Sequence, residues 1–432
     1  MPHAPPEVLS RTAPEPRPPG KTLTIIHPMD PWDQRLGGFD TCLDGILRHA
    51  PDAWRIEFIG LSTDPAARPV GRWLSSEFGG RQLRFYAVMA DADPDRVRPI
   101  PLSLRFAAAA KLRQVAPSSA LVQFHRFEPG LLIRLAPGQK TIHFPHNHPE
   151  EVDSIHSDVR WRRWGWLYRT LLKRTLRDAT GVVAVDPRTP EWAGRELPGL
   201  NGRIGWLAQW ADPHEFQPGS TQERAAARAA LQQRLDLPAG TRLIGFVGRL
   251  ERQKDPLLLL RAFCLATAQR EDIALVFVGQ GRLHGELIRE VERLRLRERV
   301  RILPPMIRSE LAGVYHGVDV VACSSGFEAG PRIVFESLAC GTPIVSFDVG
   351  QVHLALGGHA QADAGEIVRE RTPQALGAAL LRVLSVAHSE QRAQLCADAV
   401  AAFTPLAALT KLFGLYEDWA REERNSAPRS TA

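Results

Sequence analysis

Cysteine is scarce in this 432-residue sequence, and no two of its five cysteines have the C-x-x-C spacing of a zinc site or a redox pair. The five are Cys42, Cys264, Cys323, Cys340 and Cys396. Such scattered positions favour free thiols in a reducing compartment over a disulfide framework. The chain also lacks a run of about 20 apolar residues, which a membrane-spanning helix needs. We therefore expect a cytoplasmic protein.

Targeting signals and strong charge are missing as well. The first twenty residues contain seven prolines and no apolar run, so we read residues 1–20 as a disordered leader, and residues 425–432 as a similar tail. The net charge of +6 is modest for this length. It allows attraction to anionic lipid or to phosphorylated substrates, and we expect no nucleic-acid partner.

Short apolar, β-branched runs alternate with helical patterns along the whole chain, which favours parallel sheets with helical crossovers. In the first half they are 22–27, 55–61, 83–88, 120–124, 140–144 and 181–185, and in the second half 243–247, 274–278, 300–303, 318–322 and 343–347. The length predicts more than one core. We expect an α/β protein with two Rossmann-like domains facing a cleft, residues 21–210 and 211–404, and a terminal helix over 405–424 that packs back on the first domain.

Two carboxylates, Glu328 and Glu336, flank a Gly-Pro turn and the start of a predicted helix. A strand, a glycine-containing loop and a helix N-terminus together form an anion-binding corner. Carboxylates beside such a corner would repel phosphate alone. They suit a ligand that carries both phosphates and hydroxyls, such as a sugar nucleotide.

Three further loops follow predicted strands. Gly37-Gly38 precedes a helix and lets a backbone approach phosphate closely, although a glycine pair is also a common turn. Arg249 and Lys254 lie on a strand-to-helix loop and are suited to offset the charge of a departing diphosphate; the alternative is a solvated loop paired with its own acids. Gly281, in Gly-Gln-Gly, is suited to contact a ribose or base, or only turns the chain.

In order, the second half contains F-V-G-R-L-x-x-x-K-D, V-G-x-G, and D-V-V-x-x-S-S-x-x-E-A-G-P-x-x-x-x-E-S-L-A-C-G-T-P-I-V. These motifs resemble retaining glycosyltransferase family four, which has the glycosyltransferase B fold. The resemblance implies that Glu336 binds the nucleotide ribose and that Glu328 lies near the transferred sugar. It also implies that Arg249 and Lys254 hold the diphosphate.

The same resemblance implies a wider donor site. Backbone amides around Gly330, Pro331 and Arg332 would bind the diphosphate, and the Gly37-Gly38 pair would close over it from the other domain. Relatives retain anomeric configuration and use no metal, so we expect neither a metal nor another cofactor.

Two positions depart from the family pattern. His125 ends a predicted strand where relatives have two histidines separated by one residue, the second of which touches the sugar. This chain has Phe127 in the second place, and His125 remains a candidate catalytic residue. Gln351 replaces the second glycine of a pair that is common in relatives.

Two other segments are open to more than one interpretation. His143, His146 and His148 favour a loop that shapes the acceptor pocket over a metal site. Residues 160–177 predict one basic amphipathic helix with Trp161 and Trp164 on its apolar side. Such a helix either packs in the domain core or contacts an anionic membrane.

We therefore expect an enzyme that transfers a hexosyl group, with retention, from a nucleoside-diphosphate sugar to a hydroxyl acceptor. The expected acceptor is a glycan or lipid-linked saccharide in polysaccharide biosynthesis, met at the inner face of the plasma membrane. Two alternatives are a sugar-nucleotide epimerase of the same fold and a non-catalytic protein that binds a sugar nucleotide.

Overall fold

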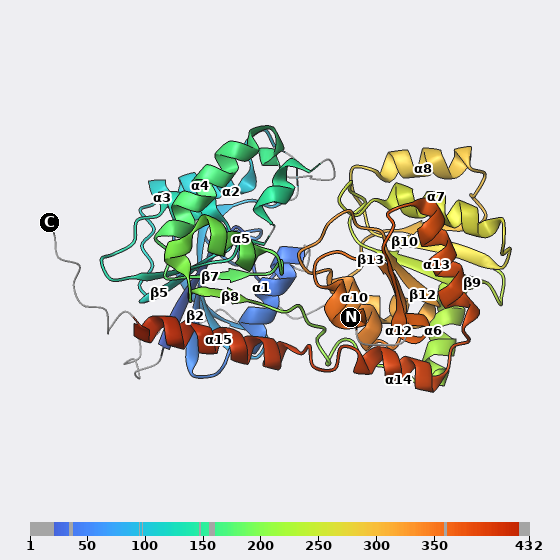
Figure 1. Ribbon diagram of the computed structural model, residues 1–432. Helices are drawn as coiled ribbons and strands as arrows, with labels where there is room; N and C mark the ends of the chain where they lie inside the picture. Colours follow the sequence, from blue (N-terminus) through green and yellow to red (C-terminus); the bar gives the residue numbers. More distant parts are fainter. Residues whose placement is uncertain are drawn as a thin grey trace.

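The chain folds into two α/β domains, each built on one sheet (Figure 1). The computed structural model describes residues 21–33, 38–94, 96, 98–146, 148–154, 160–357 and 361–422. The predicted leader, the predicted tail and Gly37 lie outside these residues. The fold class expected from the sequence is confirmed.

The N-terminal domain has an eight-stranded sheet in the order β3-β4-β2-β1-β5-β6-β7-β8. All neighbours are parallel except β3 and β4. The strands are β1 (Lys21–Ile26), β2 (Trp54–Ser62), β3 (Trp73–Phe78), β4 (Arg81–Ala90), β5 (Leu121–Phe124), β6 (Lys140–His143), β7 (Gly181–Ala184) and β8 (Ile204–Trp206). The helices are α1 (Gly38–His49), α2 (Leu102–Leu112), α3 (Phe127–Leu132), α4 (Gly165–Arg177) and α5 (Thr189–Glu196), with 3₁₀ turns η1 (Pro149–Asp153), η2 (Arg160–Trp164) and η3 (Pro198–Leu200).

The C-terminal domain has a fully parallel sheet of six strands in the order β11-β10-β9-β12-β13-β14. They are β9 (Arg242–Val247), β10 (Ile273–Val278), β11 (Val300–Leu303), β12 (Val320–Cys323), β13 (Ile344–Phe347) and β14 (Gly365–Val368). Its helices are α6 (Thr221–Arg234), α7 (Pro256–Thr267), α8 (His284–Arg293), α9 (Arg308–Gly317), α10 (Arg332–Ala339), α11 (Val352–Leu356), α12 (Gln361–Ala364), α13 (Pro373–Ser385) and α14 (Glu390–Asp398). Because the strands are parallel, the loops after them gather at one edge of the sheet.

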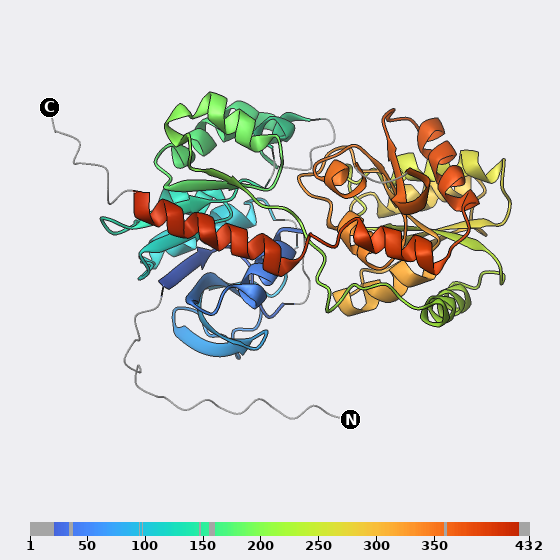
Figure 2. The ribbon, with the colours of Figure 1, turned by 60° about the horizontal axis from the view of Figure 1, so that its bottom comes forward.

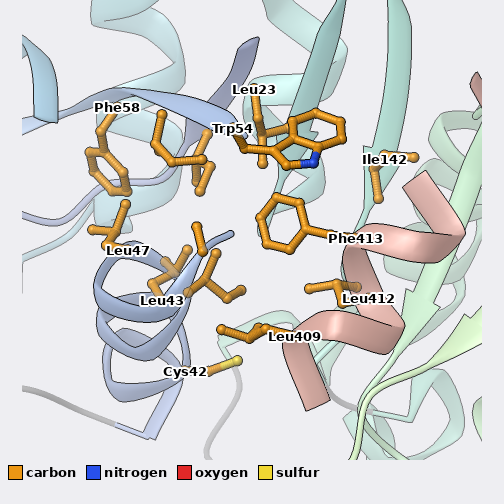
Figure 3. Close-up of a cluster of buried hydrophobic side chains, with 14 of the residues drawn as sticks. Leu23, Cys42, Leu43, Leu47, Trp54, Phe58, Ile142, Leu409, Leu412 and Phe413 are labelled. Carbon is orange, nitrogen blue, oxygen red and sulfur yellow. The ribbon is translucent and has the colours of Figure 1, made fainter. Parts of the chain in front are cut away.

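The last helix, α15 (Pro405–Glu422), leaves the C-terminal domain and lies along the N-terminal one (Figure 2). Its Leu409, Leu412 and Phe413 share a buried core with α1 and Trp54 (Figure 3). Trp419 lies flat on the sheet because Gly181 has no side chain: a Cβ there would be 2.1 Å from the Trp419 ring.

The structure differs from the sequence prediction in two places. Strands β3, β8 and β14 were not predicted, because they are short or half-exposed and lack a continuous apolar run. Residues 160–177 do not form one helix: a 3₁₀ turn precedes α4. The tighter turn changes the direction of Trp164, which is 60% exposed rather than packed with Trp161 in the core. No helix within the described residues is long and apolar enough to span a bilayer.

Candidate functional site

The predicted donor-site residues gather at the carboxyl edge of the C-terminal sheet. Arg249 and Lys254 follow β9, Gly281 follows β10, and Glu328 lies on the loop between β12 and α10. Glu336 is on α10 itself. The parallel topology therefore brings four separate loop and helix segments to one place.

Lys254 and Glu328 form a direct ion pair, with 2.5 Å between Nζ and Oε1. The Ser325 hydroxyl donates to the same carboxylate oxygen at 2.7 Å. The two charged side chains are 16% and 9% exposed, so water screens their attraction only partly. The structure thus joins the predicted diphosphate cation to the predicted sugar-side carboxylate.

Backbone hydrogen bonds hold these two loops together. The Gly326 amide donates to the Gln253 carbonyl at 2.8 Å, and the Ser324 hydroxyl donates to the Lys254 carbonyl at 2.8 Å. The Gln253 side chain also donates to the Phe327 carbonyl, at 3.3 Å. The Lys254 and Glu328 side chains therefore project from a locally fixed backbone.

Arg371 forms hydrogen bonds to both of these loops. It was not identified from the sequence. Its guanidinium donates to the carbonyls of Ser324 (3.0 Å) and Ser325 (2.9 Å), and to Asp255 Oδ2 (2.5 Å). Arg371 follows β14, and that strand was not predicted. In the sequence, only the position of Arg371 just after the β14 segment could have pointed to it.

The acids of the basic loop have other partners than Arg249 and Lys254. Glu251 pairs with Arg282 at 2.8 Å, and Asp255 pairs with Arg371. Arg249 is exposed, and within the described part of the chain its side chain contacts the Gln253 amide oxygen, at 3.3 Å. The alternative of a loop neutralised by its own acids therefore does not fit this geometry.

Both carboxylate oxygens of Glu336 are engaged. The Tyr315 hydroxyl donates to Oε2 at 2.9 Å and Arg332 Nε to Oε1 at 3.4 Å. Burial, together with the nearby Glu336 charge, raises the pKa of Tyr315 well above its ordinary value, so it remains a donor. Glu336 is 6% exposed.

The start of α10 offers fewer backbone amides than expected from the sequence around Gly330, Pro331 and Arg332. Pro331 has no amide hydrogen, so only the neighbouring amides are able to donate there; the expectation for Pro331 is corrected. A Cβ on Gly330 would lie 2.3 Å from Gln209 Cγ, so this glycine permits close contact with the segment after β8. The Arg332 guanidinium lies 5.5 Å from the centre of the Trp210 ring.

Gly281 has a packing reason for being glycine. A Cβ there would lie 2.4 Å from the Leu250 carbonyl oxygen, and the Leu250 amide donates to the Gln280 carbonyl at 2.9 Å. The loop after β10 therefore supports the Arg249 loop. Contact of Gly281 with a donor stays a prediction.

On the N-terminal domain, Gly38 begins α1 and His125 lies in a buried hydrogen-bond chain. Tyr416 of α15 donates to Gln123 Oε1 (2.7 Å), and Gln123 Nε2 contacts His125 Nε2 at 2.5 Å. The amide is the donor in that contact, so His125 carries its proton on Nδ1 and donates to His146 Nε2 at 2.7 Å.

Burial and the neighbouring His146 lower the pKa of His125 well below its ordinary value, so the ring is neutral. Both of its nitrogens are engaged, and its role at the sugar stays a prediction. His27, which follows β1, was overlooked. Its ring centre lies 5.8 Å from that of His125, and its buried Nδ1 has no hydrogen-bond partner in the part of the chain that the structure describes.

The other predicted histidines serve local structure. His143 stacks on Phe124 at 5.1 Å between ring centres, and the His148 side chain accepts from the Glu150 amide at 3.3 Å. In the part of the chain that the structure describes, no group of three or more metal-ligating side chains is arranged to hold an ion.

Comparison with known proteins gives the following similarities. Residues 227–399 match the family described as glycosyl transferases group 1. A D-inositol 3-phosphate glycosyltransferase from Corynebacterium urealyticum is 33% identical over 190 residues, which are 42% of this chain and 43% of the relative. This match thus spans less than half of the curated relative's length.

Solved structures match over nearly the whole chain. Sucrose-phosphate synthase from Thermosynechococcus elongatus has a TM-score of 0.71 at 19% identity, over 92% of this chain and 98% of that one. Anabaena HepE in complex with UDP-glucose has a TM-score of 0.64 at 15% identity, over 92% and 99%. At these identities the structural similarity concerns the fold.

Proposed function

We propose, from the match of residues 227–399 to the glycosyl transferases group 1 family, that this chain is a retaining hexosyltransferase. It moves a hexosyl group from a nucleoside-diphosphate sugar to a hydroxyl acceptor. The observation that carries this proposal is the Lys254–Glu328 pair, held at the carboxyl edge of the sheet just before α10. In a nucleoside-diphosphate sugar, the negative diphosphate is bonded directly to the hydroxyl-bearing sugar. A cation next to a carboxylate is suited to bind these two neighbouring groups.

The pair would separate when the donor binds. Lys254 and the exposed Arg249 would turn to the diphosphate and stabilise the charge that grows on the leaving group. Glu328 would accept hydrogen bonds from sugar hydroxyls and stabilise the positive charge of an oxocarbenium-like transition state. Two cations already offset the diphosphate charge, so the proposal needs no metal ion.

Glu336 would bind the ribose hydroxyls. Tyr315 and Arg332 fix the orientation of its carboxylate, and each oxygen has a further lone pair to accept from a ribose hydroxyl. Glu336 should therefore control donor affinity, and Glu328 should chiefly control turnover.

The acceptor would lie against the N-terminal domain, beside His27 and Glu128. Glu128 follows β5, on α3, and is 4% exposed. Its Oε1 accepts from Ser103 at 2.8 Å, while its Oε2 has no hydrogen-bond partner among the described residues. Unpaired buried acceptors of this kind favour a ligand rich in hydroxyls. The curated relative acts on an inositol phosphate by name, and a lipid-linked saccharide offers the same hydroxyls.

The outer side of the N-terminal domain suits contact with an anionic membrane. Helices α2, α3 and α4 lie next to one another there (Figure 1). Their segments, 98–149 and 160–177, contain one acidic residue, the buried Glu128. Large apolar side chains are exposed on them: Leu112 84%, Leu131 36%, Trp164 60% and Trp166 65%. Arginines and exposed tryptophans favour anionic lipid, while Glu150 and Glu196, the latter paired with Lys173, border this side.

Vesicle sedimentation tests this contact. Wild-type protein should bind vesicles containing phosphatidylglycerol and leave pure phosphatidylcholine vesicles unbound. Combined Trp164→Ala and Trp166→Ala substitution should weaken binding at least about fivefold, while Leu406→Ala, at an exposed apolar position on α15 (74%), should not. Equal binding to both vesicle types would refute the membrane contact.

Donor binding is tested by thermal shift with UDP, GDP, ADP and their sugars, followed by transfer assays. Glu328→Gln should abolish transfer while the nucleotide still binds. Glu336→Gln should weaken nucleotide binding at least about tenfold, since it loses a charged acceptor. Glu292→Gln, at an exposed position on α8, serves as the control. If no nucleotide stabilises the wild type, the proposal fails; an epimerised donor without any transfer product would favour the epimerase.

A further inference from the structure

The side chain of Gln351 joins the two domains. It follows β13 in the C-terminal domain and is completely buried. Its Nε2 donates to the carbonyls of Val185 (2.7 Å) and Leu207 (3.2 Å), and its Oε1 accepts from the Gln209 amide at 2.8 Å. We call these three contacts the Gln351 bridge. Val185 and Leu207 directly follow β7 and β8, so the bridge connects the carboxyl edges of the two sheets.

The bridge also touches the loop that carries Glu328. Gly350 has φ +55°, and a Cβ on it would lie 2.5 Å from the carbonyl oxygens of Glu328 and Ala329. A Cβ on Gly330 would lie 3.0 Å from Gln351 Nε2. The loop before Gln351 and the loop after Glu328 are therefore packed backbone to backbone, without room for a side chain between them.

An ion pair between the domains is of a different kind. Arg308 of α9 pairs with Asp44 of α1 at 2.9 Å. Salt screens an ionic contact of this kind when one of its members is partly exposed. The Gln351 bridge is uncharged and buried, and it uses both amide hydrogens and the amide oxygen of one side chain.

We infer that Gln351 is a positioning residue that fixes the Glu328 loop against the carboxyl edge of the N-terminal sheet. Removing its side chain leaves two carbonyls and one amide without these partners in a buried place, where unpaired groups are costly. The domains would then separate more readily, and Glu328 would lose its fixed position relative to the acceptor side. The consequence for catalysis rests on the function proposed above, whereas the structural role does not.

Amide hydrogen exchange of the full chain, without ligand, tests the structural role. Gln351→Ala should speed exchange about tenfold at residues 207–209 and also at 328–330. His353→Ala changes an exposed residue of α11, the helix that begins directly after Gln351, and should leave both segments unchanged. Faster exchange confined to residues 207–209 would overturn the inference, because the Glu328 loop would then not depend on Gln351.

A second variant covers the case in which Gln351→Ala fails to fold. Gln351→Glu keeps the acceptor for the Gln209 amide but sets a carboxylate against two carbonyls. Burial raises the pKa of such a carboxyl, and its protonated form is able to donate again. We therefore compare the amide exchange rate of Gln351→Glu at residues 328–330 with that of the wild type at the same pH. This ratio of rates should fall as the pH is lowered from about 8 to about 6. A constant ratio would count against the bridge.

Kinetics separate this inference from the proposed function. With the donor that stabilises the wild type, Gln351→Ala should lower kcat about tenfold or more and change donor KM by less than about threefold, because Gln351 makes no hydrogen bond to Arg249, Lys254 or Glu336. A raised KM with an unchanged kcat would overturn a positioning role. A wild type inactive with every donor would refute the proposed function, while the exchange result would still decide the role of Gln351.

Discussion

Arg371→Ala should release the two loops that carry Lys254 and Glu328. In the wild type the guanidinium contacts the Ser324 and Ser325 carbonyls and the Asp255 carboxylate. Among the residues that the structure describes, Arg371 is the cation that pairs with Asp255. The substitution therefore removes three hydrogen bonds from a charged donor at once, beside the Lys254–Glu328 pair.

The size of the effect follows from those contacts. A hydrogen bond to a charged group contributes roughly 1.5–3 kcal/mol when buried. The Arg371 side chain is 27% exposed, and water replaces part of each lost contact, so we expect a total loss of about 2–4 kcal/mol. Arg371→Lys keeps the charge, but an ammonium group lacks the planar fork that reaches two carbonyls and a carboxylate together. It should lose about half as much.

Urea unfolding and amide exchange measure this loss, the latter at residues 249–255 and 324–328. Arg382→Ala is the matched control, since Arg382 lies on α13, is 59% exposed and pairs with Glu366. That surface pair should contribute less than about 1 kcal/mol. If Arg371→Ala costs no more than Arg382→Ala, and both loops exchange as in the wild type, the role assigned to Arg371 is refuted.

Two further predictions concern the N-terminal domain. Burial lowers the pKa of His143 from 6.5 to about 4, so below pH 6.5 the unfolded chain takes up a proton that the folded one does not. Stability should be full above that pH and fall by up to about 3 kcal/mol on acidification to pH 4, as urea midpoints would show; a flat profile contradicts this. Gly181→Ala places a methyl group against Trp419 and should cost about 1–3 kcal/mol. Gly194→Ala, which meets no atom within 4 Å, should cost nothing, and equal midpoints for the two variants would refute the packing argument.

Continuous apolar runs allowed much of the fold to be predicted. The predicted strand 274–278 lies within β10 (Ile273–Val278), every residue of which is buried, because a buried parallel strand needs apolar side chains on both faces. The sequence of β14, Gly-Glu-Ile-Val, alternates in character and has two half-exposed residues. This pattern is too weak to predict a strand. Because β14 was not predicted, Arg371, which follows it, was not identified as a site residue either.

In the candidate site, too, local motifs could be predicted and contacts between distant residues could not. The motifs around Glu328 and Glu336 placed both on one loop-and-helix segment. The contact of Glu328 with Lys254 joins positions 74 residues apart, and no local pattern encodes such a distance. Gln351 was visible as a departure from a glycine pair, but its partners Val185 and Gln209 belong to the other domain. Only the packed structure identifies them.

The return of α15 to the N-terminal domain has a consequence for how this chain is made. About 200 residues separate the end of β8 from the start of α15, which a ribosome needs roughly 10–40 s to synthesise. During that time Leu23, Trp54 and the apolar side of α1 lack the Leu409, Leu412 and Phe413 that cover them later. The first domain to emerge is thus the last to be completed, and a nascent chain must keep an open apolar surface in the cell until its final helix appears.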